Sequence, residues 1–159
     1  MDIRSAEELE IDHLATIWHS GWQEAHARIL PAELAQYRTF ESFRQRLRAD
    51  HANVRVAGLP GQPIGFCMTK DDEVNQLYLS EDARGTGVAT ALLRDAEQVL
   101  RTQGVKTAWL ACAIGNKRAA RFYEKNSWIF VGNMICQIPI QDGTFQLEVW
   151  RYELNLKKE

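Results

Sequence analysis

A pair of glycines ahead of a helix-like segment is the first place where this sequence could do chemistry. Gly85 and Gly87 follow a β-capable run, Val74 to Leu79, and a short polar loop. After them, apolar residues recur at the spacing of one helical face: Ala89, Leu92, Leu93, Ala96 and Leu100. Glycine lets a ligand approach the backbone closely, and Gly87 could take a positive φ. The first amides of a helix lack intrahelical partners and lie at the positive end of its dipole, so the segment predicts a phosphate-binding cradle.

An ordinary tight turn is the simpler alternative for the same glycines, and two other phosphate-binding motifs do not fit them. No Lys-Ser or Lys-Thr follows the second glycine, as a Walker A loop requires, so a nucleotide triphosphatase is not expected. Thr90 stands where the third glycine of a Rossmann fingerprint would be. The motif therefore belongs to neither of these classes.

The turn resembles a motif of a known family, the GNAT superfamily of N-acetyltransferases. The pyrophosphate loop of that family, Arg-x-x-Gly-x-Gly/Ala, is matched by consecutive residues of this chain: Arg84, Gly85, Thr86, Gly87, Val88 and Ala89. The strand before the loop is similar to the one that holds the pantetheine arm in the family, and it contains Leu77, Tyr78 and Leu79.

The resemblance implies that acetyl-CoA is the co-substrate. Its phosphates would meet the backbone amides of residues 85–89, and Arg84 would screen their charge. Its pantetheine arm would pair with the backbone of residues 77–79 as an added strand.

A second motif of the same family lies further along the chain. Residues 116–123, from Asn116 to Tyr123, are similar to the family's Asn-x-x-Ala-x-x-Phe-Tyr segment. Asn116 could hold the pantetheine arm or cap its own helix. A glycine and a phenylalanine usually follow, whereas this chain has Ser127 and Trp128, a departure expected to alter packing at the helix exit more than chemistry. With two motifs in the right order, the chain is identified as a member of the GNAT superfamily.

Tyr123 is the leading candidate for a catalytic residue. When an acetyl group passes from a thioester to an amine, the departing thiolate needs a proton or a hydrogen bond. A phenol with a pKa of about 10 is neutral at pH 7 and can donate one. The resemblance places Tyr123 where the family has its matching tyrosine. The alternative is that Tyr123 simply packs beside Phe122.

The attacking amine must also lose a proton, because an ammonium has no lone pair. Glu73 is the first candidate for the base, and His26 and Glu24 are others. Many members of the family use chains of water molecules, so no side-chain base is required. Glu73 could equally be a solvated residue of an acidic turn with Asp71 and Asp72.

Aromatic residues near residue 20 are candidates for the acceptor side. In the family, this part of the chain lies near the turn that lines the acceptor pocket. Trp22 and His26 would suit a small amine through cation–π or stacking contacts. For Trp18, which is close to them, a plain core role is the better expectation.

Composition narrows the class of protein. The chain has 159 residues, which suits one domain over residues 1–159, and a formal net charge of −2, which argues against nucleic-acid binding. No segment resembles a membrane span or a signal peptide, so a cytoplasmic protein is expected. The three cysteines are expected to be buried reduced thiols, and no Cys/His set has the spacing of a metal site. A homodimer is possible, but the sequence does not decide the oligomeric state.

The elements that must position these residues can be read from the periodicity of the chain. Strands are expected at 3–5, 54–56, 64–68, 74–79, 105–113, 127–138 and 144–156, and helices at 11–25, 33–50, 89–100 and 116–125. The strand, helix, strand succession in the middle should be a right-handed parallel crossover. This order matches the GNAT topology, which implies a mixed α/β fold with a central mixed sheet of six to seven strands and helices on both faces.

The function implied is an acetyl-CoA-dependent N-acetyltransferase. Transfer would be direct, within a ternary complex, to the primary amine of a small molecule. The alternatives are a protein or peptide N-acetyltransferase and a non-catalytic acyl-CoA sensor. The presence of Tyr123 disfavours the sensor, whereas the sequence does not discriminate between the two kinds of acceptor.

Overall fold

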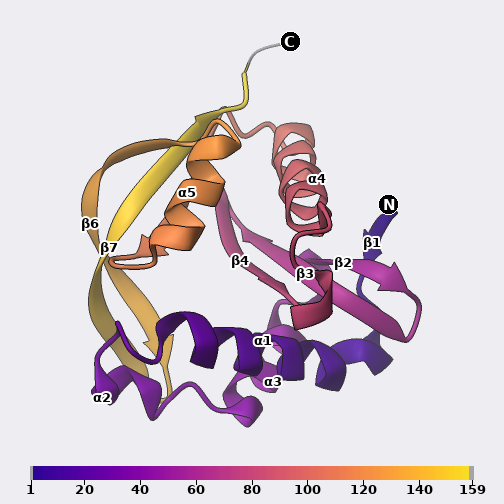
Figure 1. Cartoon of the computed structure of the whole chain (residues 1–159), viewed down its shortest axis with the longest axis horizontal. Coiled ribbons are helices and arrows are strands. Elements are labelled where there is room, and N and C mark those ends of the chain that lie inside the picture. The colour runs from indigo at the N-terminus through magenta and orange to yellow at the C-terminus, as the bar shows by residue number, and fades with distance from the viewer. Residues whose placement is uncertain (1, 158–159) are drawn as a thin grey trace.

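A seven-stranded mixed sheet forms the centre of the molecule in a computed structural model that describes residues 2–157 (Figure 1). The strands are β1 (Ile3–Ser5), β2 (Val54–Leu59), β3 (Gln62–Lys70), β4 (Glu73–Leu79), β5 (Thr107–Ala113), β6 (Ile129–Ile140) and β7 (Gly143–Asn155). Their spatial order is β1-β2-β3-β4-β5-β7-β6, and only β4 and β5 are parallel. The predicted mixed α/β fold with six to seven strands is confirmed.

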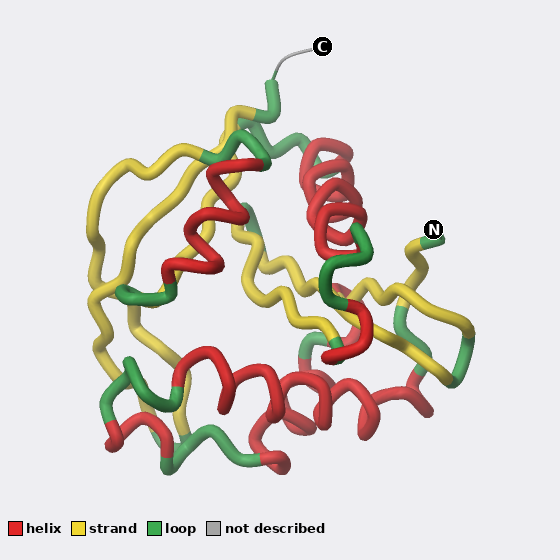
Figure 2. Tube along the Cα trace, viewed as in Figure 1, coloured by secondary structure: helices red, strands yellow, loops and turns green. Residues whose placement is uncertain are grey.

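Helices cover both faces of this sheet (Figure 2). They are α1 (Ile11–His26), α2 (Ala32–Ala35), α3 (Phe40–Ala49), α4 (Val88–Thr102) and α5 (Lys117–Lys125). On one face, α1 and α3 bury an aromatic core in which Trp18 and Phe43 stack with ring centroids 4.5 Å apart. On the other face, α4 buries Leu92 and Leu93 completely. The apolar faces of α1, α3 and α4 therefore pack against the sheet.

The segment predicted as one helix over residues 33–50 is two helices. Thr39 has extended backbone angles and accepts a hydrogen bond from the Ser42 amide at 3.1 Å, so it caps a new helix, α3. A single helix over residues 33–50 would bury Leu34, Phe40, Phe43 and Leu47 on one face. Leu34, Phe43 and Leu47 are buried, whereas Phe40 is 38% exposed because it occupies the first, outward-facing position of α3.

The remaining predicted elements overlap the observed ones. Gly104 follows the end of α4 with a φ of +86°, which is the conformation of a glycine C-cap. Within the part of the chain that the structure describes, no helix is both long and apolar enough to cross a membrane.

Candidate active site

A cavity of about 1120 Å³ opens where β4 and β5 diverge. The two parallel strands are in register at one position, where Glu73 faces Trp109, and the Trp109 amide donates to the Asp72 carbonyl at 3.2 Å. Beyond this point, β4 is paired only with β3, through Leu77 and Leu79 among others. The other edge of β4 is therefore free to pair with an extended ligand.

A β-bulge in β4 directs its side chains. Met68 of β3 faces Gln76, whereas the next residue, Thr69, faces Val74, so Asn75 is the extra residue. As a result, Val74 and Leu77 both pack on the α4 side, although strict alternation would place them on opposite faces. Tyr78 points to the α1 side. The bulge was not predicted from the sequence, and it turns β4 into a wall of the cavity.

The glycine turn has the geometry of the predicted cradle. Gly85 and Gly87 have φ values of +74° and +88°, which confirms the positive φ expected at Gly87. A Cβ atom at either position would meet no heavy atom within 4 Å, so both face open space. Gly87 is the N-cap of α4 and forms no side-chain cap, which leaves the first amides of the helix available to an anion.

Two residues of the predicted cradle contribute only their backbone. Val88 is buried in the core beneath α4, and the Thr86 hydroxyl donates to the Ala83 carbonyl inside the loop. Gly85, Gly87 and Ala89 line the cavity. This arrangement fits the pyrophosphate of a coenzyme A molecule, which backbone amides would hold.

Arg84 lines the cavity beside the cradle and already has a carboxylate partner. Its guanidinium lies 2.6 Å from a carboxylate oxygen of Glu24. The hydrogen bond from Arg84 lowers the pKa of Glu24, so this carboxylate holds a proton less readily than an ordinary glutamate. The pairing argues against Glu24 as the base.

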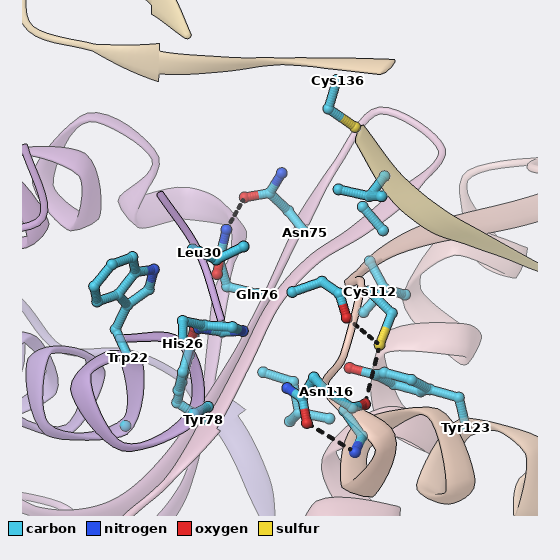
Figure 3. A pocket seen from close by; sticks show the side chains of 18 of the residues that line it. Trp22, His26, Leu30, Asn75, Gln76, Tyr78, Cys112, Asn116, Tyr123 and Cys136 are labelled. Atoms are coloured by element: carbon cyan, nitrogen blue, oxygen red, sulfur yellow. Dashed lines mark hydrogen bonds between the residues drawn. The ribbon is translucent and has the colours of Figure 1, made fainter. Parts of the chain in front are cut away.

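Tyr123 belongs to α5, and Asn116 is the N-cap residue of the same helix. Both lie across the cavity from α1 (Figure 3). Asn116 caps α5 by accepting a hydrogen bond from the Ala119 amide at 3.2 Å. The Tyr123 hydroxyl points into the cavity, and no acceptor within residues 2–157 forms a hydrogen bond with it. Burial raises the pKa of Tyr123, so its phenol keeps its proton at neutral pH and remains a donor.

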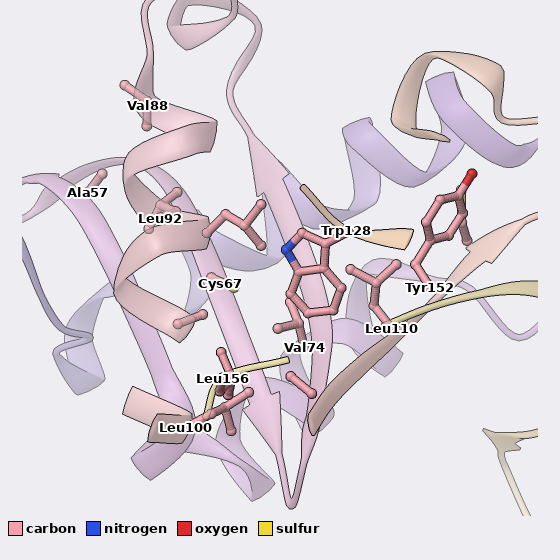
Figure 4. Packing of buried hydrophobic residues seen from close by; sticks show 14 of the residues in the cluster. Ala57, Cys67, Val74, Val88, Leu92, Leu100, Leu110, Trp128, Tyr152 and Leu156 are labelled. Atoms are coloured by element: carbon pink, nitrogen blue, oxygen red, sulfur yellow. The ribbon is translucent and has the colours of Figure 1, made fainter. Parts of the chain in front are cut away.

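The core beneath α4 and α5 contains Trp128 and Tyr152 (Figure 4), and Tyr123 packs against this core. Trp128 is buried, and its indole N–H donates to Glu97 of α4 at 3.0 Å. Its ring centroid lies 6.5 Å from that of Tyr123. Ser127 adopts a φ of +76°, the conformation for which glycine is suited. At the exit of α5, Trp128 is thus held in the core by Glu97, and the Tyr123 hydroxyl has no hydrogen-bond partner among residues 2–157.

Trp22, His26 and Tyr78 lie on the opposite wall of the cavity (Figure 3). The Tyr78 hydroxyl oxygen is 3.5 Å from Nδ1 of His26, and the Trp22 and His26 ring centroids are 5.7 Å apart. Burial lowers the pKa of His26 to about 4, so its imidazole is neutral at pH 7 but only weakly basic. These side chains can form an aromatic wall.

Glu73 lies in the cavity at the point where β4 and β5 part. Burial raises the pKa of its carboxyl, which makes it a stronger base than an exposed glutamate. Among Glu73, His26 and Glu24, it is the group whose surroundings best suit proton removal from an ammonium.

The Glu73→Gln variant should lose acetyl transfer by about 10²–10⁴-fold in kcat, because it can no longer accept the proton. In the parent protein, kcat/KM for the acceptor should fall as the pH drops through the raised pKa of Glu73, above the ordinary value of about 4.3. The variant should lack this acidic limb. Rate–pH profiles measure both effects, with Asp71→Asn in the same turn as the control. A Glu73→Gln protein with the parental profile would leave water as the base.

Cys136 corrects the prediction of three buried thiols. Cys67 and Cys112 are buried, but Cys136 is half-buried and lines the cavity. Its strand, β6, alternates between exposed and half-buried residues, because its inward row faces the cavity as well as the core.

Cys112 lies in the cavity wall, so a covalent acetyl-enzyme must be tested. Its Sγ is 3.7 Å from the Asn116 carbonyl, and burial raises the pKa of the thiol to about 12. The nucleophilic thiolate is therefore scarce at pH 7. We expect Cys112→Ala to keep kcat within a few-fold of the parent. An acetylated Cys112 peptide that forms and decays as fast as turnover would contradict this.

Arg38 and Arg46 also line the cavity, although they were not predicted as site residues from the sequence. Arg46 is three residues after Phe43 on an amphipathic helix, which is a weak signal, and Arg38 lies in a loop with no signal at all. Within residues 2–157, no group of three or more His, Cys, Asp or Glu side chains is arranged to hold a metal ion.

Comparison with known proteins identifies the family of this chain. Residues 12–128 match the acetyltransferase (GNAT) family, so the chain belongs to that family and is an N-acetyltransferase. It is 26% identical over 136 residues to an uncharacterised N-acetyltransferase of Archaeoglobus fulgidus, covering 77% of this chain and 89% of that one.

Two solved structures share the fold. A GCN5-related N-acetyltransferase from Rhodopseudomonas palustris has a TM-score of 0.74 at 20% identity, covering 97% of this chain and 94% of that one. The PaiA N-acetyltransferase of Thermoplasma acidophilum, solved in complex with coenzyme A, has a TM-score of 0.67 at 18% identity, covering 97% and 98%. At these identities, the likeness concerns the fold alone.

Proposed function

We propose that this protein, as one catalytic domain, transfers an acetyl group from acetyl-CoA directly to the primary amine of a small molecule in a ternary complex. The observation that carries the proposal is the continuity of one cavity, which joins the glycine cradle and the free edge of β4 to an aromatic compartment. A coenzyme A complex of a structural neighbour, PaiA, supports the choice of co-substrate.

Each part of the cavity has a role in this reaction. Backbone amides of residues 85–89 would hold the pyrophosphate, and the edge of β4 at residues 77–79 would hold the pantetheine arm. Bound acetyl-CoA would supply the thioester carbon that the amine attacks. Glu73 would accept the proton of the amine, and the Tyr123 hydroxyl would donate to the departing sulfur.

A contact between two lining residues, Arg38 and Pro139, favours a small acceptor over a peptide. Arg38, which precedes α3, donates from Nη1 to the carbonyl of Pro139 in β6 at 3.1 Å. Leu30 and Leu34 from one side and Ile138 from the other line the same cavity. A protein N-terminus or lysine loop would need an open groove, whereas this contact joins the segment before α3 to β6 beside the cavity.

The experiment that tests the function is a panel of acceptors with acetyl-CoA, followed by release of the free CoA thiol. The panel should contain small primary amines, amino acids and peptides with free N-termini. The proposal expects turnover with small molecules and much slower turnover with peptides. Faster turnover with peptides would favour the peptide acetyltransferase, and absence of turnover with tight acetyl-CoA binding would favour the sensor.

Replacing Trp22 or His26 by alanine should raise the acceptor KM, because each removes part of the aromatic wall. The affinity for acetyl-CoA should stay at the parental value, since neither residue belongs to the cradle or to the edge of β4. Steady-state kinetics with either substrate varied separates the two effects. The control is His13→Ala, an exposed position of the same helix. Equal losses for both substrates would indicate a folding defect instead.

A cytoplasmic location and a possible homodimer remain predictions from the sequence.

A further inference from the structure

Two arginines that line the cavity, Arg38 and Arg46, have no carboxylate partner among residues 2–157. Arg38 is 5% exposed, and Arg46 is half-buried with its guanidinium 4.7 Å from the centroid of the Trp18 ring. Within residues 2–157, no carboxylate oxygen lies within 4.0 Å of either guanidinium. Other arginines of the chain do form such ion pairs: Arg4, Arg44, Arg55, Arg84, Arg94 and Arg151.

The two charges are buried close enough to repel each other. Burial lowers the pKa of Arg38 to about 10, and repulsion from Arg46 contributes to the shift. Burial also lowers the pKa of Arg46, while Asp50 and Glu73 oppose the shift from beyond ion-pair distance. Both side chains remain protonated at pH 7. Burying two like charges without a counter-ion is costly, so the site is suited to an anion that neutralises them.

The hydrogen-bonding capacity of the arginines is also largely unused. A guanidinium has five N–H donors, and Arg38 uses one of its nitrogens on Pro139. No side-chain hydrogen bond of Arg46 to another residue of the described chain is seen. Within residues 2–157, each guanidinium nitrogen of Arg38 and Arg46 is either hydrogen-bonded or accessible to solvent, and both side chains line the cavity. The contact with Pro139 and the stacking on Trp18 explain where these side chains lie, but neither contact neutralises their positive charges.

Neighbouring side chains add to the same site. Tyr78 is close enough for both arginines to influence its titration, and burial raises the pKa of its phenol, which therefore keeps its proton. Its hydroxyl contacts His26, which is neutral at pH 7. In the proposed function, the pyrophosphate of coenzyme A would be held elsewhere, at the N-terminus of α4, which leaves the two arginines available to another anion.

We propose that Arg38 and Arg46 together bind an acidic group of the acceptor, a carboxylate or a phosphate. The acceptor class is then amino acids and related amines that carry an acidic group within a few bonds of the reacting nitrogen. This inference rests on the proposed function and names the substrate class of that site. A guanidinium pair suits both acids, because each can accept bidentate hydrogen bonds.

The test compares acceptors that differ only in the acidic group. The pairs are tryptophan with tryptamine, phenylalanine with phenethylamine, and 2-aminoethylphosphonate with ethylamine. The parent enzyme should have a higher kcat/KM for the acidic member of at least one pair. Preference confined to the amino acids would identify a carboxylate site, and preference confined to the phosphonate would identify a phosphate site.

Variants assign the preference to the arginines. Arg46→Met should lower kcat/KM for the acidic acceptor by about 10- to 100-fold, the usual effect of losing a hydrogen bond to a charged group, and leave the matched neutral amine unchanged. Arg46→Lys should restore part of the loss, because it keeps the charge without the planar fork. Arg38→Lys should act in the same direction and avoids complete loss of the contact to Pro139. Arg48→Met, exposed on the same helix, is the control.

Equal preference for both members of every pair, or a preference that persists unchanged in Arg46→Met, would overturn the inference while the proposed function stands. If no small molecule is acetylated, the proposed function fails, and binding still decides the inference. In that case the acidic compounds should raise the melting temperature of the acetyl-CoA complex in the parent and not in Arg46→Met. No such shift in the parent would overturn it.

Discussion

Replacing Gly87 by glutamate is expected to abolish the binding of acetyl-CoA. The backbone φ of +88° costs a side-chain-bearing residue about 1–2 kcal/mol, and the new Cβ meets no atom within 4 Å, so the protein should still fold. The added carboxylate would stand where the pyrophosphate meets the first amides of α4, and it would repel the phosphates. A ligand at about 100 times its Kd stabilises a protein by about 2.7 kcal/mol, and this thermal shift should vanish.

The matched control is Gly104→Glu at the other end of α4. Gly104 has nearly the same φ, +86°, and a Cβ added there would also meet no atom within 4 Å. It does not line the cavity. This variant should therefore carry the same backbone strain and keep the full shift with acetyl-CoA. A folded Gly87→Glu protein with the parental shift would refute the cradle.

Replacing Tyr123 by phenylalanine should lower kcat by about 10²–10⁴-fold, the usual contribution of general acid assistance. The substitution keeps the ring that packs against Phe122, Trp128 and Tyr152 and removes only the hydroxyl that faces the cavity. Acetyl-CoA affinity and the melting temperature should stay near the parental values. The rate should be measured in a single turnover, so that chemistry and not product release is observed.

Tyr152→Phe is the control for the loss of a nearby phenol. The Tyr152 ring centroid is 6.2 Å from that of Tyr123, but its hydroxyl donates to Glu124 at 2.6 Å and lies outside the cavity. We expect this variant to lose some stability and to keep kcat within a few-fold. Parental single-turnover rates for Tyr123→Phe would reduce Tyr123 to a packing residue.

The parts of the site that the sequence predicted are those set by local geometry. A glycine that needs a positive φ and the free amides at a helix N-terminus depend on a few neighbouring residues, so the cradle around Gly87 could be predicted. Tyr123 could be selected because its motif lies on one short helix. The glycine cradle and Tyr123 meet in one cavity provided that the strands and helices follow one another in the predicted order.

The parts that the sequence did not predict depend on contacts between distant segments. The bulge at Asn75 follows from the pairing of β4 with β3, and it decides which side chains of β4 face α4 and which face α1. That Arg38 and Arg46 lack a carboxylate partner among residues 2–157 can be recognised only when the carboxylates near them have been placed. The break before α3 had a local signal, the Thr39 and Ser42 capping box, but the helical periodicity of residues 33–50 obscured it.

The most direct test of the central claim follows the acetyl group itself. The protein is incubated with acetyl-CoA that carries ¹³C in its acetyl group and with the best small amine of the panel, and the acceptor and the intact protein are then analysed by mass spectrometry. Direct transfer predicts one labelled amide on the acceptor for each CoA thiol released, and no label on the protein. Labelled acetate without acetylated amine, or label on the protein that passes to the amine, would contradict direct transfer in this cavity.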